Sequence, residues 1–187
     1  MSIVDTLTTQ LGATVTESNE ENGLKNIFVE AESIVDVVGQ AKAAGFDMLS
    51  DIFGIDYLNY PQHRAKRFAV GYNLYSTEAN ERIFIWVRLD DGDTLQTITH
   101  LWRGANFMER ETYDMYGVEF EGHPDLRKLI TPEDLDGHPL RKDFPIGESP
   151  TLFNDGRFLD PASFRAGMTG QSDRLSGPTA GRKKAVN

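Results

Sequence analysis

The chain has 187 residues, a formal net charge of −10 and no cysteine. The length suits one domain with a tail, and the missing cysteines exclude disulfides, zinc fingers and thiolate-bound iron–sulfur clusters from this chain. A sequence pI near 4.8 disfavours non-specific binding to nucleic acid or to anionic lipid, which requires a basic surface.

The pattern of apolar residues gives no sign of a membrane segment. Apolar runs stay well short of the roughly 18 residues that a spanning helix needs. The first residues carry no basic segment of the kind that opens a signal peptide. We therefore expect neither a transmembrane helix nor a signal peptide.

The first third of the chain predicts two helices and a strand. A short helix is expected over 2–11 and a short strand over 27–29. Ser33 and Asp36 resemble a capping box, apolar residues then recur at helical spacing, and Gly45 is a plausible stop.

The middle of the chain predicts mainly strands. A strand is expected over 48–57, and alternating apolar residues over 68–74 and 83–89 predict a β-hairpin. A turn over 90–93 and a helix over 102–116 follow, the helix ending at a glycine.

Five prolines between residues 124 and 150 exclude any long helix after that point. The order of elements predicts an α+β domain with a mostly antiparallel sheet and helices packed on one face. An extended, proline-rich segment and a C-terminal tail should follow. We place the domain at 1–147 and the tail at 148–187.

The predicted tail differs in charge from the rest of the chain. It contains four acidic and six basic residues, a net of +2, against −12 for the first 147 residues. It shows no helical or strand period, yet large apolar residues are spaced along it: Leu152, Phe153, Phe158, Leu159, Phe164, Met168 and Leu175. The tail is either a flexible terminus or an arm that orders on another subunit.

Common catalytic motifs are missing. The chain has no dinucleotide or nucleotide phosphate-binding motif, no GxSxG elbow and no thiol nucleophile. His123 and His138 each stand in Gly-His-Pro, with Asp125 and Asp143 nearby, and these four groups could bind a metal. Fifteen residues is no recognised ligand spacing, so we expect turn histidines whose ring nitrogens bond backbone carbonyls.

The densest group of charges lies on the helix predicted to end at residue 116. Glu109, Arg110, Glu111 and Asp114 could act in acid–base catalysis, form a polar partner-facing surface, or include half-buried carboxylates. In the last case, Arg127 and Arg141 are candidate partners for Glu109, Glu111 and Asp114. Prolines 139 and 145 predict an extended strap over 137–145.

Three segments, 109–118, 120–128 and 137–145, together closely resemble the C subunit of the proton-pumping NADH–quinone oxidoreductase, the 30 kDa subunit family of respiratory complex I. The resemblance is specific over about 95–145. Its signature and interface positions in this chain are Glu109, Arg110, Glu111, Asp114, Gly117, His123, Pro124, Arg127, His138, Pro139, Arg141, Lys142, Asp143 and Pro145.

The resemblance implies a subunit with no catalytic residue, cofactor or metal of its own. It implies that iron–sulfur clusters, FMN, NADH and quinone are bound by partners, among them the B and D subunits of the quinone module. It also implies a peripheral position on the cytoplasmic side of the inner membrane, and a C-terminal extension that runs over neighbouring subunits.

Two other interpretations remain open from the sequence. The chain could be the equivalent scaffold in a related hydrogenase or in a ferredoxin-using complex of the NDH type. It could also be a stand-alone metal-dependent hydrolase that uses His123, Asp125, His138 and Asp143.

Overall fold

The structure is a computed structural model that describes residues 2–62 and 64–145. The chain divides into two compact units, one of residues 1–133 and 137–144 and the other of 134–136 and 145–187. The helices and strands described below belong to the first unit. The predicted tail over 148–187 lies outside the described residues.

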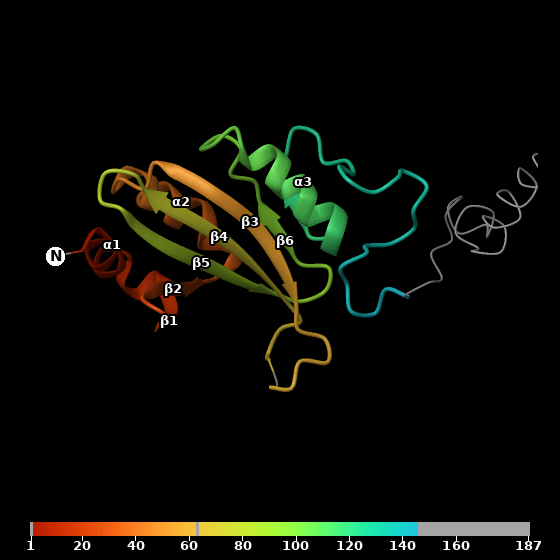
Figure 1. Cartoon of the computed structure of the whole chain (residues 1–187), viewed down its shortest axis with the longest axis horizontal. Helices are drawn as coiled ribbons and strands as arrows, with labels where there is room; N and C mark the ends of the chain where they lie inside the picture. Colours follow the sequence, from red (N-terminus) through yellow and green to blue (C-terminus); the bar gives the residue numbers. More distant parts are fainter. Residues whose placement is uncertain (1, 63, 146–187) are drawn as a thin grey trace, which may run out of the picture. The chain divides into compact units, whose positions relative to one another are not determined.

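A five-stranded sheet forms the centre of the first unit, with the strand order β1-β2-β5-β4-β3 (Figure 1). The strands are β1 (Val15–Glu21), β2 (Leu24–Val29), β3 (Met48–Asp56), β4 (Phe68–Ser76) and β5 (Glu81–Leu89). Neighbouring strands are antiparallel except β2 and β5, which run parallel. The predicted mostly antiparallel sheet is confirmed.

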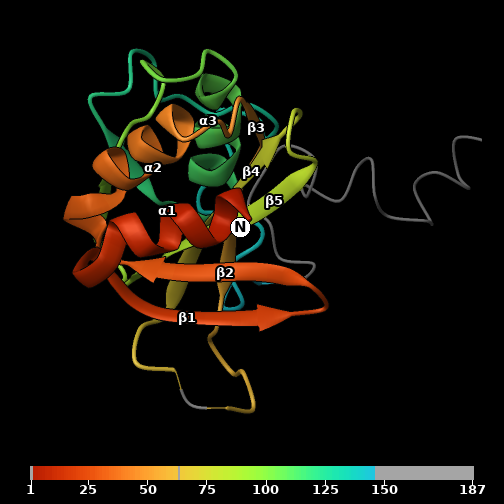
Figure 2. The same ribbon diagram turned by 90° about the vertical axis from the view of Figure 1, so that its left-hand side faces the viewer.

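Three helices pack on one face of this sheet, as predicted. They are α1 (Ile3–Leu11), α2 (Ile34–Ala43) and α3 (Ala105–Tyr116). Alternate residues of β5, from Ile83 to Leu89, are buried in the same apolar cluster as Leu7 of α1 and Val38 of α2. Figure 2 shows α1 lying beside α2.

The helix ends show where local sequence rules hold. Ser2 caps α1, because its hydroxyl accepts the backbone N–H of Val4 at 3.1 Å. The capping box predicted at Ser33 is wrong: a 3₁₀ turn over Ala31–Ser33 precedes α2, so Ser33 is already helical and its side chain makes no cap. Gly45 follows α2 with a φ of +112°, which supports its predicted role as the stop.

Three strands were not predicted. β1 is the edge strand of the sheet, and six of its seven residues are exposed, so it lacks the apolar alternation that identifies a strand. β6 (Thr94–Gln96) and β7 (Glu119–Glu121) pair in parallel but are only three residues long each. Their pairing closes the chain around α3.

Aromatic side chains cover part of the sheet face that lies opposite the helices. The rings of Phe53 and Trp86 meet edge to face with centroids 5.3 Å apart. A Cβ on Gly71 would lie 2.7 Å from Trp86 and 2.9 Å from Phe53, so glycine is required at this crossing of β4.

The chain after β7 contains no helix or strand in the described residues 122–145, as the prolines predict. The strap differs locally from the expected extended geometry. Two successive turns form it, closed by bonds from the N–H of Arg141 to the carbonyl of His138 and from the N–H of Phe144 to the carbonyl of Arg141, at 3.1 Å each. Pro139 is the second residue of the first turn. The fixed φ of proline is compatible with this turn position and also with an extended chain, so the proline alone does not distinguish them.

Candidate functional site

Glu109 lies on the inner side of α3, and its side chain is fully buried. Its Oε1 accepts the backbone N–H of Ile98 at 2.8 Å, and its Oε2 accepts the hydroxyl of Thr97 at 2.5 Å. Burial raises the pKa of Glu109, and these two hydrogen bonds offset only part of that effect. Glu109 therefore fastens α3 to the segment that follows β6.

Asp114 is also fully buried, and it holds the loop that follows β7. Its Oδ2 accepts the backbone N–H groups of Leu129, Ile130 and Thr131 at 3.0, 2.7 and 2.9 Å, and its Oδ1 accepts the hydroxyl of Thr131. Burial alone would raise the pKa of Asp114, but these hydrogen bonds outweigh it and hold the pKa below its ordinary value. The ionised carboxylate thus organises the loop.

Both histidines bond backbone carbonyls, as predicted. The Nε2 of His123 lies 3.2 Å from the carbonyl oxygen of Asn106, while its Nδ1 accepts the N–H of Asp125 at 3.0 Å. Because Nδ1 accepts in the second bond, Nε2 is the ring nitrogen that donates to Asn106. The Nδ1 of His138 lies 3.0 Å from the carbonyl oxygen of Asp114.

Gly117 allows the strap to approach the end of α3. It caps the helix with a φ of +77°, and a Cβ there would lie 2.6 Å from the ring of His138. The same ring meets Tyr113 edge to face at 5.9 Å, and Leu140 donates its N–H to the carbonyl of Met115 at 3.0 Å. The strap therefore lies directly against the last turn of α3.

The signature arginines do not pair with the α3 carboxylates, so that prediction is wrong. Glu109 and Asp114 already accept backbone and hydroxyl donors from loops that fold around them, as described above. Arg127 pairs instead with Asp125 at 2.9 Å. Arg141 pairs with Asp91, in the turn after β5.

Arg110 supports the same loop as Asp114 by a different route. Its Nε and Nη2 donate to the carbonyl oxygens of Arg127 and Lys128, each at 3.0 Å. Two residues of α3 thus hold this loop. Asp114 accepts hydrogen bonds from backbone N–H groups of the loop, and Arg110 donates hydrogen bonds to its carbonyl oxygens. Of the other signature positions, Glu111, Pro124 and the Lys142 side chain are exposed, and Pro145 belongs to the second unit.

A second ionic cluster fastens the strap to the sheet, and sequence reasoning missed its central residues. Asp56 ends β3 with a fully buried side chain and accepts Nε and Nη2 of Arg67 at 3.2 and 3.0 Å. It also accepts the N–H groups of Leu58 at 2.8 Å and Lys142 at 2.9 Å. Arg67 pairs in turn with Asp143 of the strap at 2.8 Å.

The electrostatics of this cluster favour its ionised form. Burial would raise the pKa of Asp56, but the bonds from Arg67, Lys142 and Leu58 lower it overall. Arg67 likewise holds the pKa of Asp143 below its usual range. The available signal was an aspartate at an inward position of an alternating strand, which requires a buried partner.

Two arginines of the cluster share one aromatic surface. The guanidinium groups of Arg67 and Arg141 lie 4.7 and 4.9 Å from the ring centroid of Phe68. Arg67 also pairs with Asp91 at 3.3 Å, so Asp91 joins both arginines. The strap is therefore held by charge pairs above an apolar base.

The residues proposed for a metal-dependent hydrolase do not form a site. No group of three or more histidine, cysteine, aspartate or glutamate residues could hold a metal ion within the described ranges 2–62 and 64–145. His123 engages both ring nitrogens, and Asp125 and Asp143 pair with arginines. These groups serve the packing of the loops and the strap.

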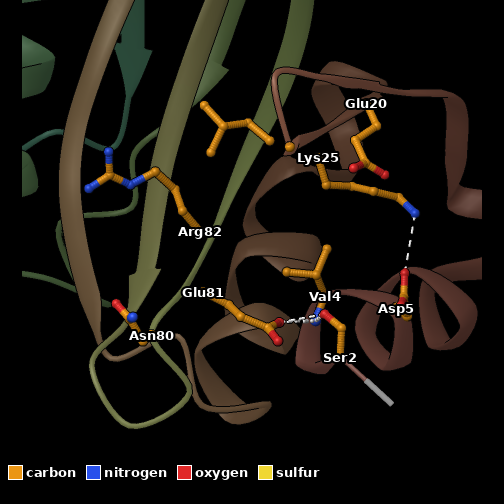
Figure 3. A pocket seen from close by; sticks show the side chains of 10 residues that line it. Ser2, Val4, Asp5, Glu20, Lys25, Asn80, Glu81 and Arg82 are labelled. Atoms are coloured by element: carbon orange, nitrogen blue, oxygen red, sulfur yellow. Dashed lines mark hydrogen bonds and ion pairs between the residues drawn. The ribbon is translucent and has the colours of Figure 1, made fainter.

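A hollow of about 400 Å³ lies where α1 begins, beside the turns of the two hairpins (Figure 3). Three of its charged groups already have partners. Glu81 accepts the hydroxyl of Ser2 at 2.5 Å and the N–H of Val4 at 3.2 Å, and Lys25 pairs with Asp5 at 3.4 Å. These contacts stabilise the start of α1.

Several large apolar side chains are exposed on α3 and on the loop and strap that bond to it. Phe107 is 60% exposed and Ile130 is 61% exposed, and Leu129 and Leu140 are exposed as well. Phe107 and Asp114 lie seven residues apart on one helix face, and Asp114 holds the backbone of Leu129 and Ile130. Exposed apolar side chains of this kind are common at protein interfaces.

The chain is similar in sequence to a family of respiratory proteins. The model of the family described as "Respiratory-chain NADH dehydrogenase, 30 Kd subunit" matches residues 27–150. NADH-quinone oxidoreductase subunit 5 of Thermus thermophilus is 50% identical over 173 residues, which cover 88% of this chain and 84% of the relative. The C subunit of NADH-quinone oxidoreductase from Novosphingobium aromaticivorans is 41% identical over 145 residues, covering 77% of this chain and 46% of the relative.

Solved structures share the fold. A trypsin-resistant fragment of Nqo5 matches with a TM-score of 0.62 and 37% identity, covering 66% of this chain and 99% of the fragment. A chain of the membrane-bound sulfane sulfur reductase, an archaeal respiratory membrane complex, matches in fold with a TM-score of 0.63 and 22% identity, covering 84% of this chain and 89% of that chain. Within the described residues, no helix has the length and apolar character required to cross a membrane. The sequence and fold together place this chain in the 30 kDa subunit family of respiratory-chain NADH dehydrogenase, as a C subunit of NADH–quinone oxidoreductase.

Proposed function

We propose that this chain is a cofactor-free structural subunit in the peripheral arm of NADH–quinone oxidoreductase. It supports electron transfer from NADH to quinone, coupled to proton translocation, without carrying electrons itself. Iron–sulfur clusters, FMN, NADH and quinone bind to other subunits. The chain contacts the B and D subunits and is held through them at the cytoplasmic side of the inner membrane.

The observation that carries this proposal is that two carboxylates of α3 point inward while apolar side chains near them are exposed. The buried signature carboxylates, Glu109 and Asp114, hold loops of the same chain. Their oxygens accept hydrogen bonds from those loops and do not face a substrate. The apolar groups beside them, above all Phe107 and Ile130, face outward. A rigid scaffold that presents exposed apolar side chains suits docking better than catalysis.

The test is assembly of a variant at one of these side chains. In Ile130→Glu a charge enters the proposed interface, so we expect at least about a tenfold loss of the chain from the purified complex. Met48→Glu is the matched control, since Met48 is 48% exposed on β3 and gains the same charge away from α3. Quantitative mass spectrometry of the purified complex measures both.

The same measurement identifies the assembly. Recovery of Ile130→Glu at the level of the control, with both folded, would contradict docking through α3. Co-purification with hydrogenase subunits or with a ferredoxin-using module, in place of NADH-oxidising subunits, would assign the chain to a related complex.

A further inference from the structure

A basic loop joins β3 to β4 and extends away from the end of the sheet in both views (Figures 1 and 2). We define the basic loop as the described residues 57–62 and 64–67. It contains no acidic residue, although the whole chain has a net charge of −10. Arg64 and Lys66 therefore give this projection a sign opposite to that of the molecule.

Two tyrosines hold the guanidinium group of Arg64. It lies 5.4 Å from the ring centroid of Tyr57 and 5.6 Å from that of Tyr60, and the two rings meet edge to face at 5.6 Å. A turn closed by the N–H of Tyr60 and the carbonyl of Tyr57, at 2.9 Å, keeps both rings together. The guanidinium is thus oriented before any partner arrives, which lowers the entropy lost on binding.

Lys66 and Arg67, the basic residues that follow Arg64, pair with aspartates, whereas Arg64 makes no such pair within the described residues. Arg67 pairs with three aspartates inside the ionic cluster, and Lys66 pairs with Asp93 at 3.6 Å. Arg64 is exposed, and no carboxylate lies within ion-pairing distance of it in the described part of the chain. Its planar fork of donors matches a carboxylate, which it can bind in a bidentate manner.

A hollow of about 360 Å³ lies beside this arginine. Its walls include Tyr57, Tyr60, Arg64 and Lys66 of the loop and Asp90, which follows β5. Tyrosine and arginine are also the residue types that contribute most to binding at protein interfaces.

We propose that the basic loop docks an acidic segment of a neighbouring subunit, with a carboxylate of that segment bound by Arg64 between Tyr57 and Tyr60. This inference rests on the proposed function, because it gives the chemistry of one contact within the assembly. A protein carboxylate is favoured over an anionic lipid surface, since lipid recognition of this kind uses clusters of about four to eight basic residues. The loop offers fewer, and the acidic body of the chain is repelled by such a surface.

The test uses the full chain in its purified complex. Arg64→Glu should lower incorporation by at least about tenfold, because like charges would meet at the contact. Arg82→Glu is the matched control, since Arg82 is also exposed and also lies over a tyrosine ring, 5.5 Å from the centroid of Tyr75, and its reversal changes the net charge equally. Thermal unfolding of both free variants should stay close to that of the wild type, because Arg64 is exposed, makes no ion pair within the described part of the fold, and gains little from its ring contacts at the surface.

Crosslinking then identifies the partner. With p-benzoylphenylalanine in place of the exposed Gln62, light should attach the loop to a peptide of another subunit that contains aspartate or glutamate. Changing that acidic residue to arginine should restore assembly of Arg64→Glu. Normal assembly of Arg64→Glu, or a crosslink to a peptide without an acidic residue, would overturn the proposal.

Two further outcomes separate the alternatives. The wild-type chain and Arg64→Glu can be compared for binding to vesicles that contain about 30% phosphatidylglycerol, an anionic lipid. Binding of the wild type alone, together with unchanged assembly of the variant, would assign the loop to lipid and overturn the inference. Failure of the wild-type chain itself to enter the complex would overturn the proposed function first.

Discussion

Glu109 shows how a single buried carboxyl links stability to pH. Its pKa is raised in the folded chain because burial disfavours the charged form, so the carboxyl contributes stability below its unfolded pKa and loses it as the pH rises through the folded pKa. The Nε2 of His123 lies 3.9 Å from the Oε2 of Glu109, and the hydroxyl of Thr97 donates to the same oxygen. Neither contact removes the effect of burial on the pKa of Glu109. Ionisation of Glu109 therefore weakens the attachment of α3.

Glu109→Gln should remove this dependence. Relative to the wild type, the variant should gain stability from pH 5 to pH 8, because its amide stays neutral throughout (with a Glu reference pKa of about 4.3). Urea unfolding followed by tryptophan fluorescence at the two pH values measures the difference. Equal pH slopes for the two proteins would show that Glu109 does not titrate in this range.

Gly117 can be tested against a glycine with the same backbone angle. Gly23 has a φ of +74° with nothing near its absent Cβ, whereas at Gly117 a φ of +77° is combined with the ring of His138 at 2.6 Å. Gly23→Ala should cost about 1 kcal/mol from backbone strain, and Gly117→Ala at least about 1 kcal/mol more from the clash. Equal losses in thermal unfolding would mean that His138 moves aside freely.

At the scale of elements, the ionic cluster decides how firmly the strap is held. In Arg67→Gln the buried Asp56 would keep only its backbone donors, so we expect a loss of about 3 kcal/mol. Amide hydrogen exchange at 140–144 should accelerate, because Lys142 and Asp143 lose their shared anchor.

The neighbouring lysine provides the control for this change. Lys66 pairs with Asp93 at 3.6 Å with both side chains partly exposed, so Lys66→Gln should change stability by less than about 1 kcal/mol. Equal effects of the two substitutions on denaturation would show that burial of Asp56 adds nothing to the cluster.

Sequence periodicity predicted the elements that have an apolar side and missed those that do not. The β4–β5 hairpin and α3 follow their alternating and helical patterns closely. The exposed strand β1 has no such pattern, and the two strands of the small sheet are too short to show one. Strand pairing across the sheet depends on tertiary packing, which spacing alone does not encode.

The sequence indicated some residues of the candidate site but not their partners, and it missed Asp56 and Arg67. Gly117, His123 and His138 have the local roles that their turn motifs indicate. Asp114 finds its donors in a loop fifteen or more residues away, and Arg141 finds Asp91 fifty residues away. The number and spacing of charges could not predict which carboxylate pairs with which arginine, because backbone N–H groups compete with arginine for the same oxygens.

For the whole molecule, the tail is the part whose role depends on assembly. Truncation after Gly147 should leave the thermal unfolding of the domain unchanged, since the described core is complete before that residue. Incorporation into the complex should fall, because the spaced apolar residues of 148–187 would no longer reach neighbouring subunits. Full incorporation of the truncated chain would contradict a docking role for the tail.

The edges of the sheet have a consequence for the chain before it meets its partners. β1 ends the sheet on one side with Glu20 and Glu21, and on the other side the Thr112 hydroxyl of α3 donates to the Ile52 carbonyl of β3 at 3.2 Å. Mutual repulsion of the carboxylates disfavours strand addition between two copies at the first edge, and a helix obstructs it at the second. Both features therefore disfavour edge-to-edge aggregation of newly synthesised chains before they assemble into the complex.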